Sequence, residues 1–127
     1  MAQNKIERYL IDLMYSYREI GEGMWLIDDE AHSLMGVVVL YAPPLVVVRE
    51  GVMPVPSTGQ LELFRKLLEF NAKDLLHGAY ALEKDEIVLV DTLEYDTMDY
   101  EDFRASLDAL SLALGQHYPV LSEYRSK

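Results

Sequence analysis

The residue types that most often carry chemistry are sparse in this chain of 127 residues, and none of them forms a catalytic or metal-binding pattern. None of the histidines His32, His77 and His117 has a second ligand three or four residues away on the same helix, as zinc sites on helices require. Ser33 and Ser57 stand in no nucleophile motif. Cysteine is absent, which excludes thiolate ligands and disulfides and suits a reducing compartment. The sequence therefore predicts a protein that is not an enzyme and that carries no metal and no cofactor.

Acidic side chains cluster between residues 91 and 108, where Arg104 is the one basic residue. They are Asp91, Glu94, Asp96, Asp99, Glu101, Asp102 and Asp108. A calcium loop needs acidic residues at alternate positions around a central glycine, and this segment has neither feature. A carboxylate pair of the glycoside hydrolase kind stays open as an alternative, although nothing in the sequence places two of them across a cleft. We interpret the segment as a solvated acidic surface.

The overall charge restricts the partners that this chain can bind. Its formal net charge is −11, and its 11 basic residues are scattered. This disfavours nucleic acid, because no basic run could neutralise phosphates, and it disfavours an anionic membrane surface. No apolar stretch approaches the ~20 residues of a transmembrane helix, and the N-terminal residues do not resemble a signal peptide. We therefore expect a single cytoplasmic domain over residues 1–127 that binds protein rather than nucleic acid or membrane.

Apolar periodicity and turn residues predict an α+β domain with the element order α-β-β-β-α-β-β-α. Its five strands should form a mainly antiparallel sheet with three helices. The expected helices are Gln3–Ile20, Gly59–Leu76 and Tyr100–Tyr118, and the expected strands are Gly23–Asp28, Leu34–Tyr41, Leu45–Arg49, Ala79–Glu83 and Glu86–Leu93. Residues 51–56 should form a linker, Gly78 should close the central helix in the left-handed conformation, Asp99 should cap the last helix and Pro119 should end it.

Two features suggest apolar surface beyond the needs of one chain. The central helix is apolar over more than half its circumference, since Leu63, Leu67 and Phe70 widen its buried stripe. The valine-rich strands around Pro43 and Pro44 do not alternate apolar with polar residues, so both of their faces should be covered. A second subunit or the last helix with the C-terminal tail could supply the second cover, and the sequence does not choose between them.

The segment between Leu67 and Val90 carries a family resemblance. It reads Leu67-Leu68-Glu69-Phe70-Asn71-Ala72, then His77-Gly78-Ala79-Tyr80-Ala81-Leu82, then Ile87-Val88-Leu89-Val90. This pattern and the element order resemble the type III secretion chaperones (the Tir-chaperone-like group) and, more closely, the YbjN-type proteins. The resemblance implies that Asn71, His77 and Gly78 are structural, with Asn71 bonding backbone near the helix end. It also implies a small acidic homodimer that holds an extended segment of another protein.

The combined prediction is a non-enzymatic dimeric module for chaperone-like capture of an extended or partly unfolded protein segment. The alternative is a regulatory, signal-transduction domain that recognises a folded protein partner. Leu63, Leu67 and Phe70 are the predicted dimer interface, and Val38, Val46 and Val48 are the predicted partner-binding residues. A bound segment would lie in a groove between helix and sheet or add a strand to a sheet edge.

Overall fold

The computed structural model describes residues 4–125, which fold into three α-helices and one six-stranded sheet. The elements, in chain order, are α1 (Lys5–Asp12), β1 (Tyr17–Gly21), β2 (Met24–Asp29), the short 3-10 helix η1 (Glu30–His32), β3 (Leu34–Ala42), β4 (Leu45–Pro54), α2 (Gln60–Lys73), β5 (Ala79–Glu83), β6 (Glu86–Glu94) and α3 (Tyr100–Ser122). The predicted α+β class, three helices and antiparallel pairing are confirmed.

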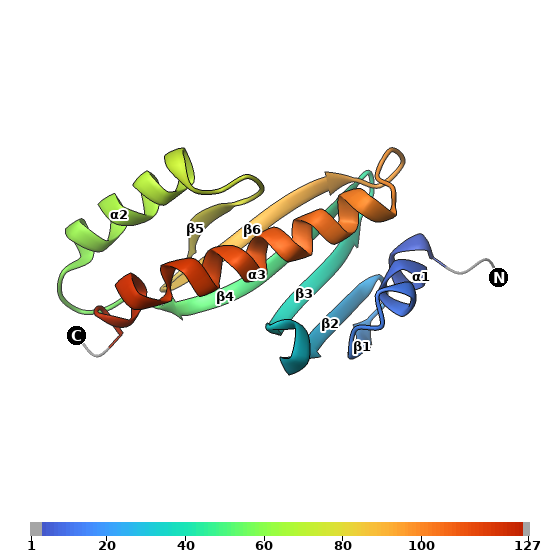
Figure 1. Cartoon of the computed structure of the whole chain (residues 1–127), viewed down its shortest axis with the longest axis horizontal. Helices are drawn as coiled ribbons and strands as arrows, with labels where there is room; N and C mark the ends of the chain where they lie inside the picture. The colour runs from blue at the N-terminus through green and yellow to red at the C-terminus, as the bar shows by residue number, and fades with distance from the viewer. Residues whose placement is uncertain (1–3, 126–127) are drawn as a thin grey trace.

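All neighbouring strands pair antiparallel, in the order β1-β2-β3-β4-β6-β5, so β1 and β5 are the two edges. The helices lie on one side of this sheet (Figure 1), with α3 running along β4 and β6, α2 beside β5, and α1 near β1 and β2. Tyr9 of α1 contacts the rings of Tyr100 and Phe103, which joins α1 to the start of α3.

The alternation of side chains along each strand decides which of them enter the core. Toward the helices point Trp25, Ile27, Val37, Val39, Val46, Val48, Ile87 and Leu89, all of them buried. The in-between positions point to the opposite face, where no helix of residues 4–125 lies, and they are half-buried: Leu26, Val38, Leu40, Val47 and Val90. We call this second set the open sheet face. The valine-rich strands are therefore apolar on both faces of the sheet, although the helices of one chain cover only one of these faces.

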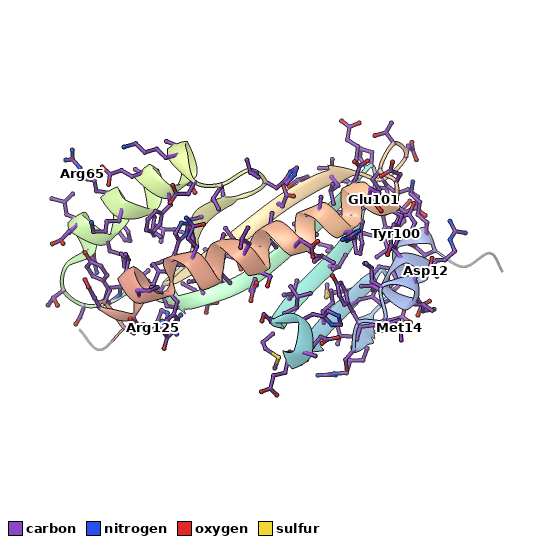
Figure 2. The ribbon with its side chains drawn as sticks, viewed as in Figure 1. Asp12, Met14, Arg65, Tyr100, Glu101 and Arg125 are labelled. Carbon is purple, nitrogen blue, oxygen red and sulfur yellow. The ribbon has the colours of Figure 1, made fainter. Side chains whose placement is uncertain are left out.

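The prediction of five strands is wrong, because residues 17–21 form a sixth strand, β1, instead of continuing the first helix. Helix α1 ends at Asp12. Met14, labelled in Figure 2 beyond the end of α1, has a φ of 60°, which is incompatible with a right-handed helix. Tyr17 then pairs with Ile27 of β2. The apolar spacing of the segment fits a helix, but the ladder to β2 overrides it. The predicted start at Gln3 lies outside the described residues.

Two other boundaries differ from the prediction for physical reasons. The supposed linker belongs mostly to β4, which runs to Pro54 with an irregularity in its pairing between Gly51 and Met53. Helix α3 continues through Pro119 to Ser122, because Leu121 is fully buried and holds the last turn against the core. The predicted start of α3 is confirmed: the Asp99 carboxylate accepts the Asp102 N–H at 2.8 Å, and the Asp102 carboxylate accepts the Asp99 N–H at 3.1 Å.

Candidate functional site

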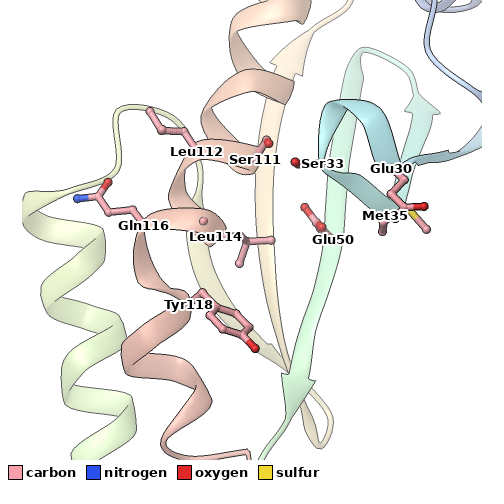
Figure 3. A pocket seen from close by; sticks show the side chains of 10 residues that line it. Glu30, Ser33, Met35, Glu50, Ser111, Leu112, Leu114, Gln116 and Tyr118 are labelled. Atoms are coloured by element: carbon pink, nitrogen blue, oxygen red, sulfur yellow. The ribbon is translucent and has the colours of Figure 1, made fainter.

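A broad groove of about 920 Å³ opens between the second half of α3 and the segment formed by η1 and the start of β3. Figure 3 shows its two walls, with Ser111, Leu114 and Tyr118 on α3 facing Ser33 and Met35 across it. Helical spacing places Ser111, Leu114 and Tyr118 on one side of α3, since they lie three and four residues apart. We call this site the α3 groove.

Exposed apolar side chains line the α3 groove. Met35 is 52% exposed, Leu112 is 68% exposed and Tyr118 is 58% exposed, although each is large and apolar or aromatic. Scattered exposed apolar residues are ordinary on a protein surface, but several around one hollow mark a binding site. No Lys or Arg lies among the residues that line this groove.

The groove also contains a buried carboxylate, that of Glu50 on β4 (Figure 3). Glu50 is 6% exposed, and its Oε1 has no hydrogen-bond partner within residues 4–125. Burial alone raises the pKa of this carboxyl from 4.5 to about 7, because a charge is poorly solvated there. Sequence reasoning missed Glu50 because the predicted strand stopped at Arg49. The alternation of side chains along the strand could have revealed it: Val46 and Val48 point toward the helices, so the side chain at position 50 must point the same way if the strand continues.

Asp29 shows how this fold normally treats a buried carboxylate. It is 7% exposed, and it accepts hydrogen bonds from the backbone N–H groups of Ser16 at 2.7 Å and His32 at 3.1 Å. The Ser16 bond is the main reason that the pKa of Asp29 is lowered, with His32 adding to it. Asp29 is therefore a structural residue that joins β2 to the α1–β1 connection and to η1, whereas Glu50 has no such partner.

A second polar cluster lies under α3 and is fully paired. His117 is 2% exposed, and its Nδ1 lies 2.7 Å from the Tyr80 hydroxyl while its Nε2 lies 2.9 Å from Asp74 Oδ2. Phe70 stacks on the His117 ring at 3.7 Å between centroids. Burial, together with the charges of Glu50 and Asp74, raises the pKa of Tyr80, so the phenol stays protonated and donates to Nδ1. The cluster fastens the end of α2 to α3 and β5.

The predicted structural residues Asn71, His77 and Gly78 differ from the prediction in the contacts or positions that the structure gives them. Asn71 bonds backbone, as expected, but in β5 and not at the helix end: its Oδ1 accepts the Tyr80 N–H at 2.8 Å and its Nδ2 donates to the Tyr80 carbonyl at 3.2 Å. Helix α2 ends at Lys73, so the exposed His77 does not reach its last carbonyls. Gly78 has the predicted positive φ, at 80°, but it directly precedes β5 and does not close the helix.

The predicted interface residues lie mostly inside the chain. Leu63 is 0% exposed and Leu67 is 6% exposed, so both pack into the core of a single chain, and Phe70 stacks on His117. The exposed leucines of α2 are instead Leu61, at 86%, and Leu68, at 68%. The dimer itself stays a prediction, but any contact through α2 would have to use these two leucines.

The predicted partner-binding valines divide between the two faces of the sheet. Val46 and Val48 are fully buried beneath the helices, so no partner of the folded chain can touch them. Val38 lies on the open sheet face opposite Arg49 of β4 and Leu26 of β2. Of the three, it alone is placed to meet another molecule.

The acidic segment is partly committed to the structure of α3. Asp99 and Asp102 cap the helix, and Arg104 lies 3.5 Å from both Glu101 and Asp108. Asp91 accepts the Ser106 hydroxyl at 2.7 Å. Within the described residues, no group of three or more His, Asp or Glu side chains is arranged to hold a metal ion. In the same part of the chain, no helix has the length and apolar character to cross a membrane.

Comparison with known families agrees with this architecture. The family model CesT_Tir_1 matches residues 1–127. The chain belongs to the CesT_Tir_1 family. The resemblance to the Tir-chaperone-like group is thereby confirmed over the whole sequence. A search of curated proteins found no match to this sequence.

Solved structures share the CesT_Tir_1 fold at low sequence identity. The crystal structure of YbjN, a putative transcription regulator from E. coli, is 15% identical, with a TM-score of 0.69 over 95% of this chain and 94% of that one. The HopA1-SchA chaperone-effector complex contains a chain that is 10% identical, with a TM-score of 0.62 over 94% and 89%. The ExsC-ExsE complex contains one that is 17% identical, with a TM-score of 0.51 over 89% and 92%. At these identities the likeness shows the fold alone.

Proposed function

We propose that this CesT_Tir_1 protein is a non-enzymatic binding module that holds an extended or partly unfolded segment of another protein in the α3 groove. The observation that carries the proposal is the set of exposed apolar side chains around that groove, chiefly Met35, Leu112 and Tyr118. The presence of this fold in a chaperone-effector complex supports the same activity. The acidic character of the chain, at −11, would favour basic segments over acidic ones.

An extended segment suits the groove better than a compact ligand. The groove is long, open and bounded by side chains from α3 on one side and from η1 and β3 on the other. A chain in β conformation presents alternate side chains to opposite sides, so its apolar residues could contact Leu114 and Tyr118 while its polar residues face water. Few of the groove's apolar side chains would then have to move.

A peptide array tests this proposal directly. Random-sequence peptides spotted on cellulose should retain the labelled protein when they contain alternating apolar residues, because only an unfolded segment can enter the groove. Met35→Ser should reduce retention several-fold. Met14→Ser is the matched control, since Met14 is also exposed, at 82%, but lies outside the groove. Equal retention by the two variants, or no retention by the parent protein, would refute capture through this groove.

We also propose that two copies associate through the exposed leucines of α2, Leu61 and Leu68, and not through the predicted interface residue Phe70, which stacks on His117. A two-fold pair would cover apolar surface that a single chain leaves in water. Sedimentation at micromolar concentration should give about twice the chain mass of 14.6 kDa. The double variant Leu61→Asp and Leu68→Asp should sediment as a folded monomer, because both side chains are exposed in a single chain. A monomeric parent protein would exclude the dimer.

The second candidate function is regulation through a folded protein partner. The open sheet face around Val38 favours it, since a flat apolar face suits a folded surface better than a single strand. The solved YbjN structure with this fold is described as a putative transcription regulator. A protein that ignores every array peptide, and whose Val38→Asp variant loses a partner recovered in folded form, would favour this function over segment capture.

A further inference from the structure

Within residues 4–125, two buried side-chain atoms lack a hydrogen-bond partner, Trp25 Nε1 and Glu50 Oε1, and of these only the Glu50 oxygen belongs to an ionisable group. Asp29, Ser106 and His117 are each buried, and each has at least one hydrogen-bond partner at 3.1 Å or less. Glu50 is equally buried, yet its Oε1 has no partner in residues 4–125. Nearly all buried polar atoms in native proteins are paired, so an unpaired carboxylate needs a reason. Its position in the α3 groove supplies one, because Glu50 lines the groove and a bound ligand would lie beside this residue.

We propose that Glu50 is the recognition site for a cationic side chain, Lys or Arg, of the protein segment that the α3 groove binds. This inference rests on the proposed function and adds the chemistry of the partner to it. The segment would place apolar residues against Leu114 and Tyr118 and insert one basic residue between α3 and β3 to meet the Glu50 carboxylate.

The electrostatics of the groove favour a cation over any other group. Glu30 and Glu50 are its charged lining residues, and no Lys or Arg among the lining residues opposes them. An acidic side chain would be repelled by the Glu50 carboxylate, and a neutral amide or hydroxyl would donate a hydrogen bond without compensating the charge, whereas a guanidinium or ammonium group would do both. Burial raises the pKa of Glu50 to about 7, and a bound cation would lower it again.

The shape of the groove favours a side chain over a free ion. Lys and Arg carry apolar stems that can lie along apolar surface while the charged end reaches a buried acceptor. Met35 and Leu114 border the approach to Glu50 and would contact such a stem. A metal ion would need several oxygen ligands, and the described residues offer no group of three or more acidic or histidine side chains arranged for one.

The test uses short synthetic peptides with alternating valine and serine and one central Arg, Lys, Gln or Glu. Fluorescence anisotropy should show that the parent protein binds the Arg peptide about 10- to 100-fold more tightly than the Gln peptide, as expected for a hydrogen bond between charged groups. Glu50→Gln should abolish this preference, so that the Arg and Gln peptides bind this variant with equal affinity. Glu22→Gln is the matched control: it removes the same charge at an exposed turn outside the groove and should keep the preference.

Three results would overturn the inference, and they differ in what else they overturn. Equal affinity of the parent protein for the Arg and Gln peptides, with both weakened by Met35→Ser, would remove the role of Glu50 and keep the groove as the binding site. No binding of any peptide would refute the proposed function together with the inference. Binding of the small guanidinium compound agmatine as tightly as the Arg peptide would replace the protein segment with a small organic cation.

Discussion

Glu50→Gln should raise the stability of the free protein by an amount that depends on pH. Glu50 is 6% exposed, and its pKa in the folded chain is about 7 against 4.5 for a solvated glutamate. Below pH 4.5 the carboxyl is protonated in both the folded and the unfolded states, so its charge does not affect the free energy of unfolding. As pH rises from 4.5 to 7, the unfolded chain releases the proton while the folded chain keeps it, and the parent protein loses stability.

The size of the effect follows from the gap between these two pKa values, at about 1.4 kcal/mol for each pH unit. The loss is complete above the folded-state pKa of about 7, where it amounts to about 3 kcal/mol. Glutamine has nearly the same shape and no charge, so Glu50→Gln removes this pH-dependent loss. The difference in free energy of unfolding between variant and parent should therefore be near its minimum at pH 4 and about 3 kcal/mol larger at pH 8.

Urea unfolding followed by circular dichroism at a series of pH values measures this difference. Any constant offset caused by the glutamine amide is the same at every pH, so only the slope of the difference tests the argument. Glu22→Gln, at an exposed turn, should give a difference that stays flat over the same range. A flat difference for Glu50→Gln would mean that its carboxylate is solvated or paired in solution, contrary to the structure. A more stable variant that binds basic peptides less tightly would show stability given up for recognition.

Three more substitutions test the end of α2 and its connection to β5. Asn71→Ala should destabilise the fold by about 1–3 kcal/mol in urea unfolding, because the Tyr80 N–H and carbonyl lose their partner. His77→Ala, at an exposed position, should change stability by less than about 0.5 kcal/mol. Equal effects of the two variants would refute the role given to Asn71. Gly78→Val should lower the free energy of unfolding by at least about 2 kcal/mol in the same measurement, since φ is 80° and a Cβ would lie 2.8 Å from the Val90 carbonyl oxygen. A loss below about 1 kcal/mol would show that the start of β5 moves freely to make room for the side chain.

Local signals predicted the elements whose boundaries are set by local chemistry. The capping residue Asp99 fixed the start of α3, and the turn at Lys84 and Asp85 fixed the β5–β6 hairpin, as the structure confirms. The segment after Leu13 was mispredicted because its tyrosines and isoleucine fit both a helix and a strand, and only the long ladder to β2 decides between them. Pro119 ended the predicted helix, although burial of Leu121 carries α3 past it.

The candidate site was less accessible to sequence reasoning than the fold. The groove joins residues of η1 and β3 to residues of α3 that follow about eighty positions later, and no local pattern predicts such a juxtaposition. Asn71 was expected to bond backbone, but its actual partner, Tyr80, is known only once α2 lies along β5. Glu50 could have been found by extending the inward phase of Val46 and Val48 by one more step.

The two hydrogen bonds between Asn71 and the backbone of Tyr80 make the two edges of the sheet unequal. On β5, the side chain of Asn71 occupies the outward-facing N–H and carbonyl of Tyr80, and α2 lies alongside. On β1, no strand within residues 4–125 pairs with the outer side. Growth of sheets into filaments needs two sheet edges on each molecule that are free to pair with a strand, one for each neighbouring molecule. Asn71 blocks the β5 edge at Tyr80, so the addition of a strand from another copy is favoured at β1 over β5.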